Sequence, residues 1–167
     1  NKGTQHKAPV VAIAGGLGSF EPRKPKLENI EFYEDKGVAY IIKDPEVYRN
    51  KKVVISGGGD SALDWSIFLS EVATEVTLIH RRNEFRGALD SVDKVQELKD
   101  NEKINIITPA EVTALIGETQ LEAIEVTKSG EPPVRIETDS FIPLFGLSPK
   151  LGPIGDWGLE IQKNAIK

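Results

Sequence analysis

Short apolar runs alternate with amphipathic segments through the middle of the chain. Lys52–Ser56 (KVVIS), Glu75–Ile79 (EVTLI) and Ile104–Ile107 are continuous runs, which predicts strands buried on both faces of a parallel sheet. Between the runs, apolar residues recur every three or four positions, so we expect two crossover helices. The helix-defining positions are Ala62, Trp65, Leu69 and Val72 in the first helix, and Leu89, Val92, Val95 and Leu98 in the second.

The pattern changes in the second half of the chain. Glu111–Ile116, Leu121–Lys128 and Val134–Thr138 predict three strands with no helix between them, and the last two are separated by a turn at Ser129–Pro133. Phe141–Phe145, which is interrupted by Pro143, predicts a further strand. We therefore expect an α/β fold in which an antiparallel β-meander is inserted into a parallel sheet. Near the start, Val10–Ala14 predicts one more strand, followed by glycines and a Pro-rich basic linker.

Composition narrows the possible functions. The 167 residues include 39% apolar residues and carry a net charge of −5, which gives no general attraction to nucleic acid or to anionic membranes. There is no cysteine and there are only two histidines, so we expect neither a thiolate nor a metal centre. We predict a cytoplasmic protein that binds neither nucleic acid nor membrane. Because the chain begins at Asn1 and contains no methionine, we also expect it to be a piece of a longer protein.

A glycine-rich loop stands directly after the first run of the predicted parallel sheet and opens a predicted helix. Gly57-Gly58-Gly59-Asp60-Ser61-Ala62 matches the Gly-x-Gly-x-x-Gly/Ala pattern, and its position between strand and helix is the context that this pattern requires. Gly57 permits the tight turn, Gly59 lets the backbone approach a pyrophosphate, and Ala62 lets the helix pack closely on the strand. Asp60 and Ser61 are candidates for capping the helix N-terminus, whose free N–H groups attract phosphate. The motif predicts a Rossmann-like, three-layer dinucleotide-binding domain; the alternative is a glycine turn that holds no ligand.

The end of the next predicted strand indicates which dinucleotide is bound. A site for NAD places an acidic residue there, about 20 residues beyond the glycines, to accept a hydrogen bond from the ribose 2′-hydroxyl. This chain instead has His80-Arg81-Arg82, followed by Arg86. Guanidinium groups match a phosphate dianion, so the cluster predicts a pocket for the 2′-phosphate of NADP(H), with His80 adding a hydrogen bond. The alternative is a solvated basic loop. We find no arrangement of side chains that indicates a catalytic residue.

The segment from Lys52 to Arg86 resembles the NADPH domain of the low-molecular-weight thioredoxin reductase family. In that family the Gly-Gly-Gly-Asp-Ser-Ala loop holds the pyrophosphate and the His-Arg-Arg-x-x-x-Arg segment holds the 2′-phosphate. The resemblance extends back through Gly37–Tyr40 and Val11–Gly15, and forward through Phe145–Pro149. It implies that Phe145 and Gly146 lie near the cofactor.

One departure from thioredoxin reductase indicates a particular branch. The redox Cys-x-x-Cys of that enzyme is replaced here by Ile41–Asp44, so a dithiol route for electrons is absent from this segment. The chain therefore resembles the cysteine-less ferredoxin/flavodoxin–NADP⁺ reductases. Residues 18–23 and 151–160 also resemble the hinge regions of that family. This resemblance implies a full-length homodimer that holds FAD and NADP(H) and exchanges electrons with ferredoxin or flavodoxin.

The family's length and motifs imply a domain division. Residues 1–23 would be a fragment of the FAD domain and a hinge, 24–147 the NADP(H)-binding domain, and 148–167 the return hinge and the start of the C-terminal FAD-domain segment. On this interpretation the chain alone binds NADP(H) but not FAD and has no activity. Two other hypotheses stay open: a stand-alone NADPH-binding module, and a cysteine-less thioredoxin reductase relative with another acceptor.

Overall fold

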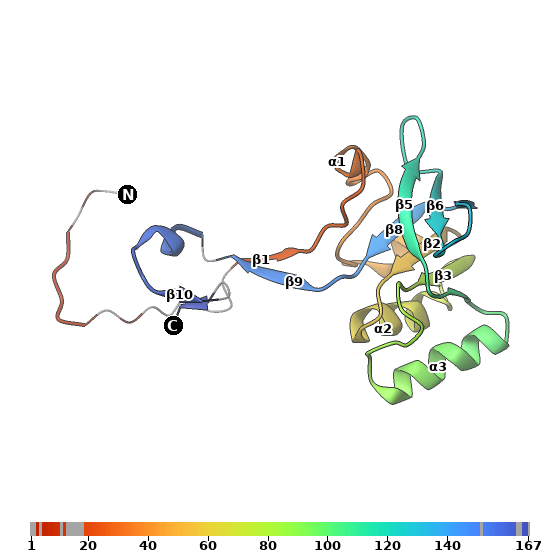
Figure 1. Ribbon diagram of the computed structural model, residues 1–167, viewed down its shortest axis with the longest axis horizontal. Coiled ribbons are helices and arrows are strands. Elements are labelled where there is room, and N and C mark those ends of the chain that lie inside the picture. Colours follow the sequence, from red (N-terminus) through yellow and green to blue (C-terminus); the bar gives the residue numbers. More distant parts are fainter. Residues whose placement is uncertain are drawn as a thin grey trace. The chain divides into compact units, whose positions relative to one another are not determined.

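The computed structural model describes residues 3, 5–10, 12, 19–150, 152–162 and 165–166 (Figure 1). The chain divides into two compact units. Pro22–Gly146 forms the larger unit, and Asn1–Glu21 together with Leu147–Lys167 forms the smaller one. These divisions fall next to the expected boundaries at residues 23 and 147. Assignment of the outer segments to an FAD domain stays a prediction.

A four-stranded parallel sheet forms the centre of the larger unit. Its strands stand in the order β4-β3-β2-β8. β2 (Lys52–Ser56) and β3 (Glu75–Ile79) have the bounds that the apolar runs predict, while β4 (Asn105–Ile107) and β8 (Ser140–Pro143) are shifted by one or more residues. The continuous runs therefore predicted a parallel sheet correctly, because both faces of these strands are covered.

Two helices connect the parallel strands, as predicted, but their packing differs in detail. α2 (Asp60–Leu69) ends before Val72, and α3 (Leu89–Asp100) buries Val95 and Leu98. Leu89 was expected in the core but is 78% exposed. The first turn of α3 instead contacts α2 through a hydrogen bond that the Ser91 hydroxyl donates to Asp64 (2.9 Å). Helical spacing alone therefore did not show which turns of α3 pack into the core.

The predicted meander is a separate three-stranded antiparallel sheet in the order β5-β6-β7. It consists of β5 (Glu111–Ile116), β6 (Ala123–Thr127) and β7 (Val134–Glu137). Two short helical segments complete the larger unit, α1 (Ile30–Tyr33) and the 3₁₀ helix η1 (Pro45–Tyr48).

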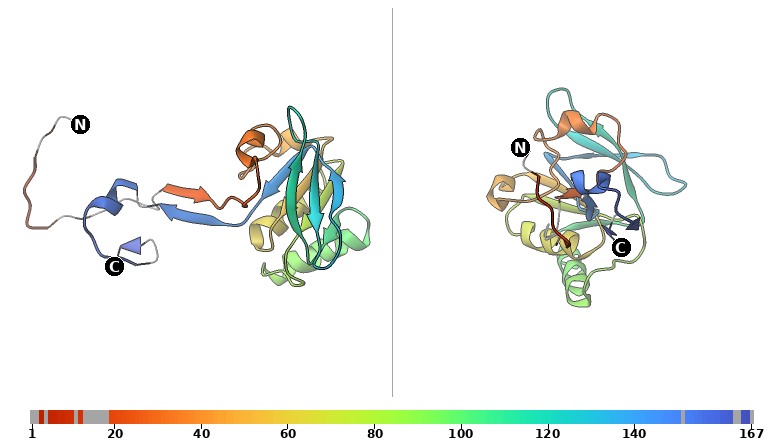
Figure 2. Two further views of the ribbon diagram at one scale, coloured as in Figure 1. Left: turned by 45° about the horizontal axis from the view of Figure 1, so that its top comes forward. Right: turned by 90° about the vertical axis from the view of Figure 1, so that its left-hand side faces the viewer.

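Three layers result, with the parallel sheet in the middle (Figure 2). Along β2, Val53 and Ile55 pack into the core beneath α2 and α3, whereas Val54 packs into a second core beneath the antiparallel sheet and α1. The strands β3 and β8 divide their side chains in the same way. The fold is thus the predicted α/β arrangement of helices, parallel sheet and meander.

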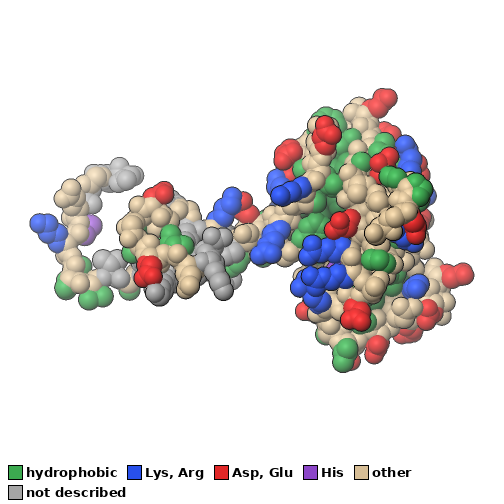
Figure 3. Space-filling model, in the orientation of Figure 1, with side chains coloured by type: hydrophobic (Ala, Val, Ile, Leu, Met, Phe, Trp, Pro, Cys, Tyr) green, Lys and Arg blue, Asp and Glu red, His purple; other side chains and the backbone are tan. Residues whose placement is uncertain are grey.

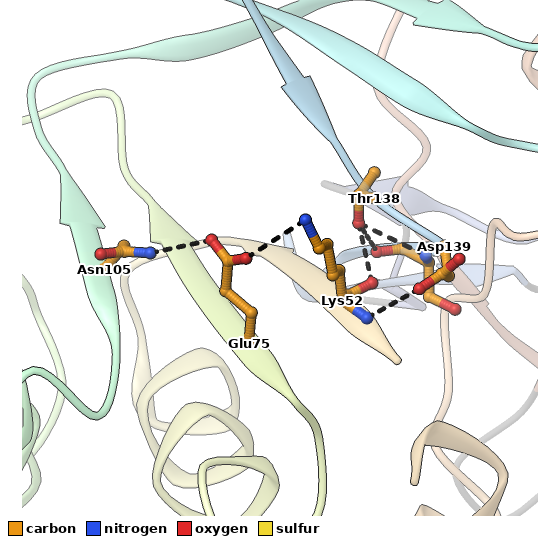
Figure 4. Close-up of polar contacts among 6 residues, drawn as sticks. Lys52, Glu75, Asn105, Thr138 and Asp139 are labelled. Carbon is orange, nitrogen blue, oxygen red and sulfur yellow. Dashed lines mark hydrogen bonds and ion pairs between the residues drawn. The ribbon is translucent and has the colours of Figure 1, made fainter. Parts of the chain in front are cut away.

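A chain of polar contacts links all four strands at the amino edge of the parallel sheet (Figure 4). Asn105 donates to Glu75 (3.1 Å), and the Lys52 ammonium pairs with the same carboxylate (3.7 Å). The backbone N–H of Lys52 donates to Asp139 (2.8 Å), and the Thr138 hydroxyl donates to the Lys52 carbonyl (2.9 Å). These contacts bridge the strands in their observed order and support their register.

Among the described residues of the smaller unit there are two pairs of short strands. β1 (Ser19–Pro22) pairs with β9 (Leu147–Lys150), and β10 (Ile161–Gln162) pairs with β11 (Ala165–Ile166). The 3₁₀ helix η2 (Gly152–Asp156) lies between them in sequence. The strand predicted over Val10–Ala14 falls largely outside the described residues. Within the described part of the chain, no helix has the length and apolarity needed to cross a bilayer.

Candidate functional site

The carboxyl end of β2 lies at the point where the strand order reverses. β2 has β3 on one side, reached through α2, and β8 on the other, reached only after β4 and the whole meander. Open α/β sheets bind ligands outside the carboxyl ends of strands at such a switch point. Gly57 follows β2 directly, and the backbone N–H of Leu144, after β8, donates to the Ser56 carbonyl (2.7 Å). The predicted glycine loop therefore occupies the edge where a ligand is expected.

The first two glycines of this loop are required by packing. A Cβ on Gly57 would lie 2.8 Å from the Ala62 Cβ and 2.8 Å from the Leu144 carbonyl oxygen, so only glycine lets α2 and β8 approach so closely. Ala62 is itself fully buried, in keeping with its predicted role in close helix packing. A Cβ on Gly58 would lie only 2.3–2.5 Å from three atoms of the His80 ring.

The third glycine is different, because nothing lies within 4 Å of the position that a Gly59 Cβ would take. Gly59 is the N-cap residue of α2, with φ −104° and ψ 179°, a conformation that any residue adopts. Glycine here leaves open space beside the helix N-terminus, and the free N–H groups of a helix N-terminus attract an anion. The structure thus fits a pyrophosphate approaching at Gly59.

The expectation that Asp60 and Ser61 cap α2 is wrong. Gly59 is the N-cap, and no side chain forms a capping hydrogen bond there. Asp60 is already the first helical residue, and its carboxylate accepts a hydrogen bond from the backbone N–H of Ala88 (2.7 Å). Ser61 is exposed in the first turn of the helix. Asp60 therefore ties the helix N-terminus to the segment that precedes α3.

That segment carries the three arginines predicted to bind the 2′-phosphate. Arg81, Arg82 and Arg86 are exposed, and none of them forms an ion pair with another described residue. The backbone N–H of Arg86 donates to the Gly58 carbonyl (2.6 Å), which joins this arginine loop (residues 81–88) to the glycine loop. Figure 3 shows Lys and Arg side chains gathered on this part of the larger unit. Three unneutralised guanidinium groups next to a helix N-terminus favour a polyanionic ligand.

His80 does not stand beside the arginines on the surface. It is 6% exposed, lies beneath Gly58, and stacks on Phe85 with ring centroids 5.5 Å apart. Burial lowers the pKa of His80 and the nearby arginines lower it further, while a hydrogen bond with the Glu84 backbone opposes both effects. The proposed hydrogen bond from His80 to the phosphate thus has no support in this geometry, since the ring is covered by the loops.

Phe145 and Gly146 follow the end of β8, next in sequence to the residue that contacts Gly57. Phe145 is 41% exposed, and Gly146 adopts a left-handed φ of 86° that favours glycine. The Gly146 carbonyl accepts a hydrogen bond from the backbone N–H of Arg23 (3.0 Å), where the chain enters and leaves the larger unit. Their contact with a cofactor stays a prediction.

The chain belongs to the pyridine nucleotide-disulphide oxidoreductase family, whose model matches residues 1–167. It is 71% identical over 167 residues to the ferredoxin–NADP reductase of Flavobacterium johnsoniae, covering 100% of this chain and 47% of that protein. The chain thus spans about half the length of the curated relatives it matches.

Solved structures agree with the fold. Thioredoxin reductase from Lactococcus lactis is 26% identical, with a TM-score of 0.76 over 88% of this chain and 48% of that one. The enzyme from T. acidophilum is 23% identical, with a TM-score of 0.78 over 87% of this chain and 47% of that one. The predicted resemblance to the thioredoxin-reductase-like family is therefore confirmed.

One residue that builds the site, Phe85, was not predicted from the sequence; it supports the His80 ring. Asp60 was predicted as a site residue, but its carboxylate holds the arginine loop instead of capping the helix. Phe85 lies within the His-Arg-Arg-x-x-x-Arg segment, and an apolar residue in an otherwise polar loop was the available signal.

Proposed function

We propose that this chain is the NADP(H)-binding domain of an FAD-dependent ferredoxin (or flavodoxin)–NADP⁺ reductase. The domain binds and orients the nicotinamide dinucleotide and, by itself, performs no redox step. Gly57–Ala62 hold the pyrophosphate, Arg81, Arg82 and Arg86 hold the 2′-phosphate, and Phe145 and Gly146 border the cofactor at the end of the sheet.

One observation carries the NADP(H) assignment: the arginine loop and the glycine loop are directly bonded. Because the Arg86 N–H donates to the Gly58 carbonyl, cationic side chains are held beside the open space at Gly59. A dinucleotide with its pyrophosphate at Gly59 meets guanidinium groups that form no ion pairs within the described part of the chain. That arrangement suits a 2′-phosphate. Residues 80–82 include no carboxylate that could accept a hydrogen bond from a free 2′-hydroxyl.

In the longer protein the cofactors would supply the redox chemistry: NADPH would provide hydride, and the flavin would pass its electrons on one at a time. This chain's part is to place the nicotinamide dinucleotide. FAD and the homodimer contact are proposed for the longer protein.

The acceptor is proposed from the relatives and from one missing feature. The relatives that match along this whole chain are named ferredoxin–NADP reductases. Where thioredoxin reductase by resemblance carries its redox dithiol, this chain has Ile41–Asp44. We therefore favour ferredoxin or flavodoxin over a disulphide as the electron partner, and a cytoplasmic setting.

Paired arginine substitutions test the cofactor assignment. Arg81→Ala plus Arg82→Ala is expected to weaken NADP⁺ binding far more than NAD⁺ binding, because each lost charge-assisted hydrogen bond costs about 1.5–3 kcal/mol. The matched control is Arg49→Ala plus Arg135→Ala, which removes the same charge from exposed arginines that pair with Glu46 and Glu137. Equal losses for NADP⁺ and NAD⁺ in the site variant would contradict a 2′-phosphate pocket.

Turnover by the longer protein tests the acceptor. NADPH oxidation is followed with purified ferredoxin, with flavodoxin and with a small disulphide. We expect reduction of ferredoxin or flavodoxin and none of the disulphide. Disulphide turnover alone would instead support the cysteine-less thioredoxin reductase relative, and binding of NADPH with no turnover of any acceptor would support a stand-alone binding module.

A further inference from the structure

The His80 side chain lies where the two loops of the proposed site meet. His80 follows β3, its backbone N–H donates to the Ile107 carbonyl (3.2 Å), and its carbonyl accepts from the Ala110 N–H (2.9 Å). Both bonds fix the residue to the segment at the end of β4. The imidazole is therefore held on a rigid part of the sheet rather than on a free loop.

Both loops rest on this one ring. On the glycine loop, the position of a Gly58 Cβ is 2.3 Å from the ring carbon between the nitrogens and 2.5 Å from each nitrogen. On the arginine loop, Phe85 stacks on the ring with an interplanar angle of 25°. The Arg86 N–H then bonds to the Gly58 carbonyl and closes the connection between the loops. The imidazole is thus packed against both the glycine loop and the arginine loop.

The polarity of the ring explains only part of its place. A hydrogen bond with the Glu84 backbone ties the ring to the arginine loop. Nε2, by contrast, is buried and has no hydrogen-bond partner, and an unpaired buried polar atom costs stability. An apolar ring would avoid that cost but lose the bond with Glu84, so the packing against Gly58 and Phe85 is the reason for a flat aromatic side chain here.

We propose that His80 is a positioning residue for the dinucleotide: its ring spaces the glycine loop and the arginine loop so that one molecule engages both its pyrophosphate and its 2′-phosphate. The proposal rests on the proposed function, because it presumes that NADP(H) binds at these loops. His80 acts through Gly58 and Phe85 and does not itself touch the cofactor.

The ratio of NADP⁺ to NAD⁺ affinity tests this role, measured by calorimetric titration of the 167-residue chain. A residue that only stabilises the fold would, when removed, weaken both dinucleotides alike and leave the ratio unchanged. We expect His80→Ala to lower the ratio at least ~10-fold, because the arginine loop loses its support. His80→Phe keeps a flat ring and is expected to hold the ratio within about threefold of the wild-type value.

Two results would overturn the proposal: a wild-type ratio in His80→Ala, or a loss in His80→Phe as large as in His80→Ala. If His80→Ala does not fold, Phe85→Ala removes the stack from the other side and is expected to lower the ratio in the same way; an unchanged ratio there would also refute the proposal.

A second measurement separates this inference from the proposed function. If the wild-type chain shows no preference for NADP⁺, the proposed function fails, and the spacing role is then judged by stability alone. The shift in urea midpoint caused by Gly58→Ala is compared in the His80 and His80→Ala backgrounds. We expect the shift to be at least halved when the ring is absent, and equal shifts in the two backgrounds would show that the ring does not set the position of Gly58.

Discussion

Adjacent glycines in one loop are expected to respond differently to the same added methyl group: Gly58→Ala in stability, and Gly59→Ala in NADP⁺ binding. In Gly58→Ala the new Cβ would lie 2.3–2.5 Å from the His80 ring, whereas carbon atoms in contact prefer about 3.5–4.0 Å. The ring is buried and stacked, so the loop must move by roughly 1 Å, and overpacking of this kind costs about 1–3 kcal/mol of unfolding free energy.

In Gly59→Ala the methyl group enters open space, at a backbone conformation that alanine adopts readily. A less flexible unfolded chain adds about 0.4–1 kcal/mol of stability, and the weaker N-cap removes a similar amount. The unfolding free energy should therefore change little. The methyl group would stand where the pyrophosphate approaches, so we expect at least ~10-fold weaker NADP⁺ binding, about 1.4 kcal/mol.

Urea denaturation of both variants, with and without NADP⁺, measures the two effects together. A ligand that binds only the folded chain raises the unfolding free energy, and with it the midpoint, by an amount that grows with the logarithm of its affinity. We expect a low midpoint for Gly58→Ala without ligand, and for Gly59→Ala a wild-type midpoint that NADP⁺ raises less than it raises that of the wild-type chain. A Gly59→Ala chain that NADP⁺ stabilises as well as wild type, or a Gly58→Ala chain with an unchanged midpoint, would refute this expectation.

Two further predictions concern stability. Thr138→Val removes the hydroxyl that donates to the Lys52 and Ser140 carbonyls (2.9 and 3.0 Å). Urea unfolding should therefore show a loss of about 1–2 kcal/mol in unfolding free energy. The control, Thr113→Val at an exposed site, should cost less than about 0.5 kcal/mol. The second concerns pH. Burial and the arginines hold the pKa of His80 in the folded chain below its ordinary value, so between that folded pKa and about pH 6.5 the unfolded chain binds more protons than the folded chain. The stability that is present above about pH 6.5 therefore declines as the pH falls toward the folded pKa. Denaturation at several pH values between about 7 and 5 should show a smaller decline for His80→Phe, and an identical decline in both proteins would contradict this.

The layered fold could be predicted from the sequence because the features that indicate it lie close together along the chain. Continuous apolar runs such as Lys52–Ser56 are typical of strands covered on both faces, and the helix-free stretch after β4 indicated the meander. The position of Ala62 at the start of the helix likewise indicated its close packing on the strand. These features depend on neighbours along the chain.

The misjudged features depend on contacts between distant segments. Leu89 has the right helical spacing, yet only later turns of α3 reach the core. Asp60 suits a cap by type, but the nearby Ala88 N–H takes its carboxylate instead. His80 stands next to two arginines in sequence, while strand geometry sends its ring under Gly58. Residue type and spacing identified which residues form the site but not which of them face a ligand.

We propose that the glycine loop and the arginine loop form one site for NADP(H). Calorimetric titration of the wild-type chain with NADP⁺ and with NAD⁺, at the same low salt concentration, tests it most directly. We expect NADP⁺ to bind at least ~30-fold more tightly than NAD⁺, a difference of about 2 kcal/mol. Equal affinities for the two dinucleotides, or no binding of either by a chain whose circular dichroism melt shows it to be folded, would show that the two loops do not form an NADP(H) site.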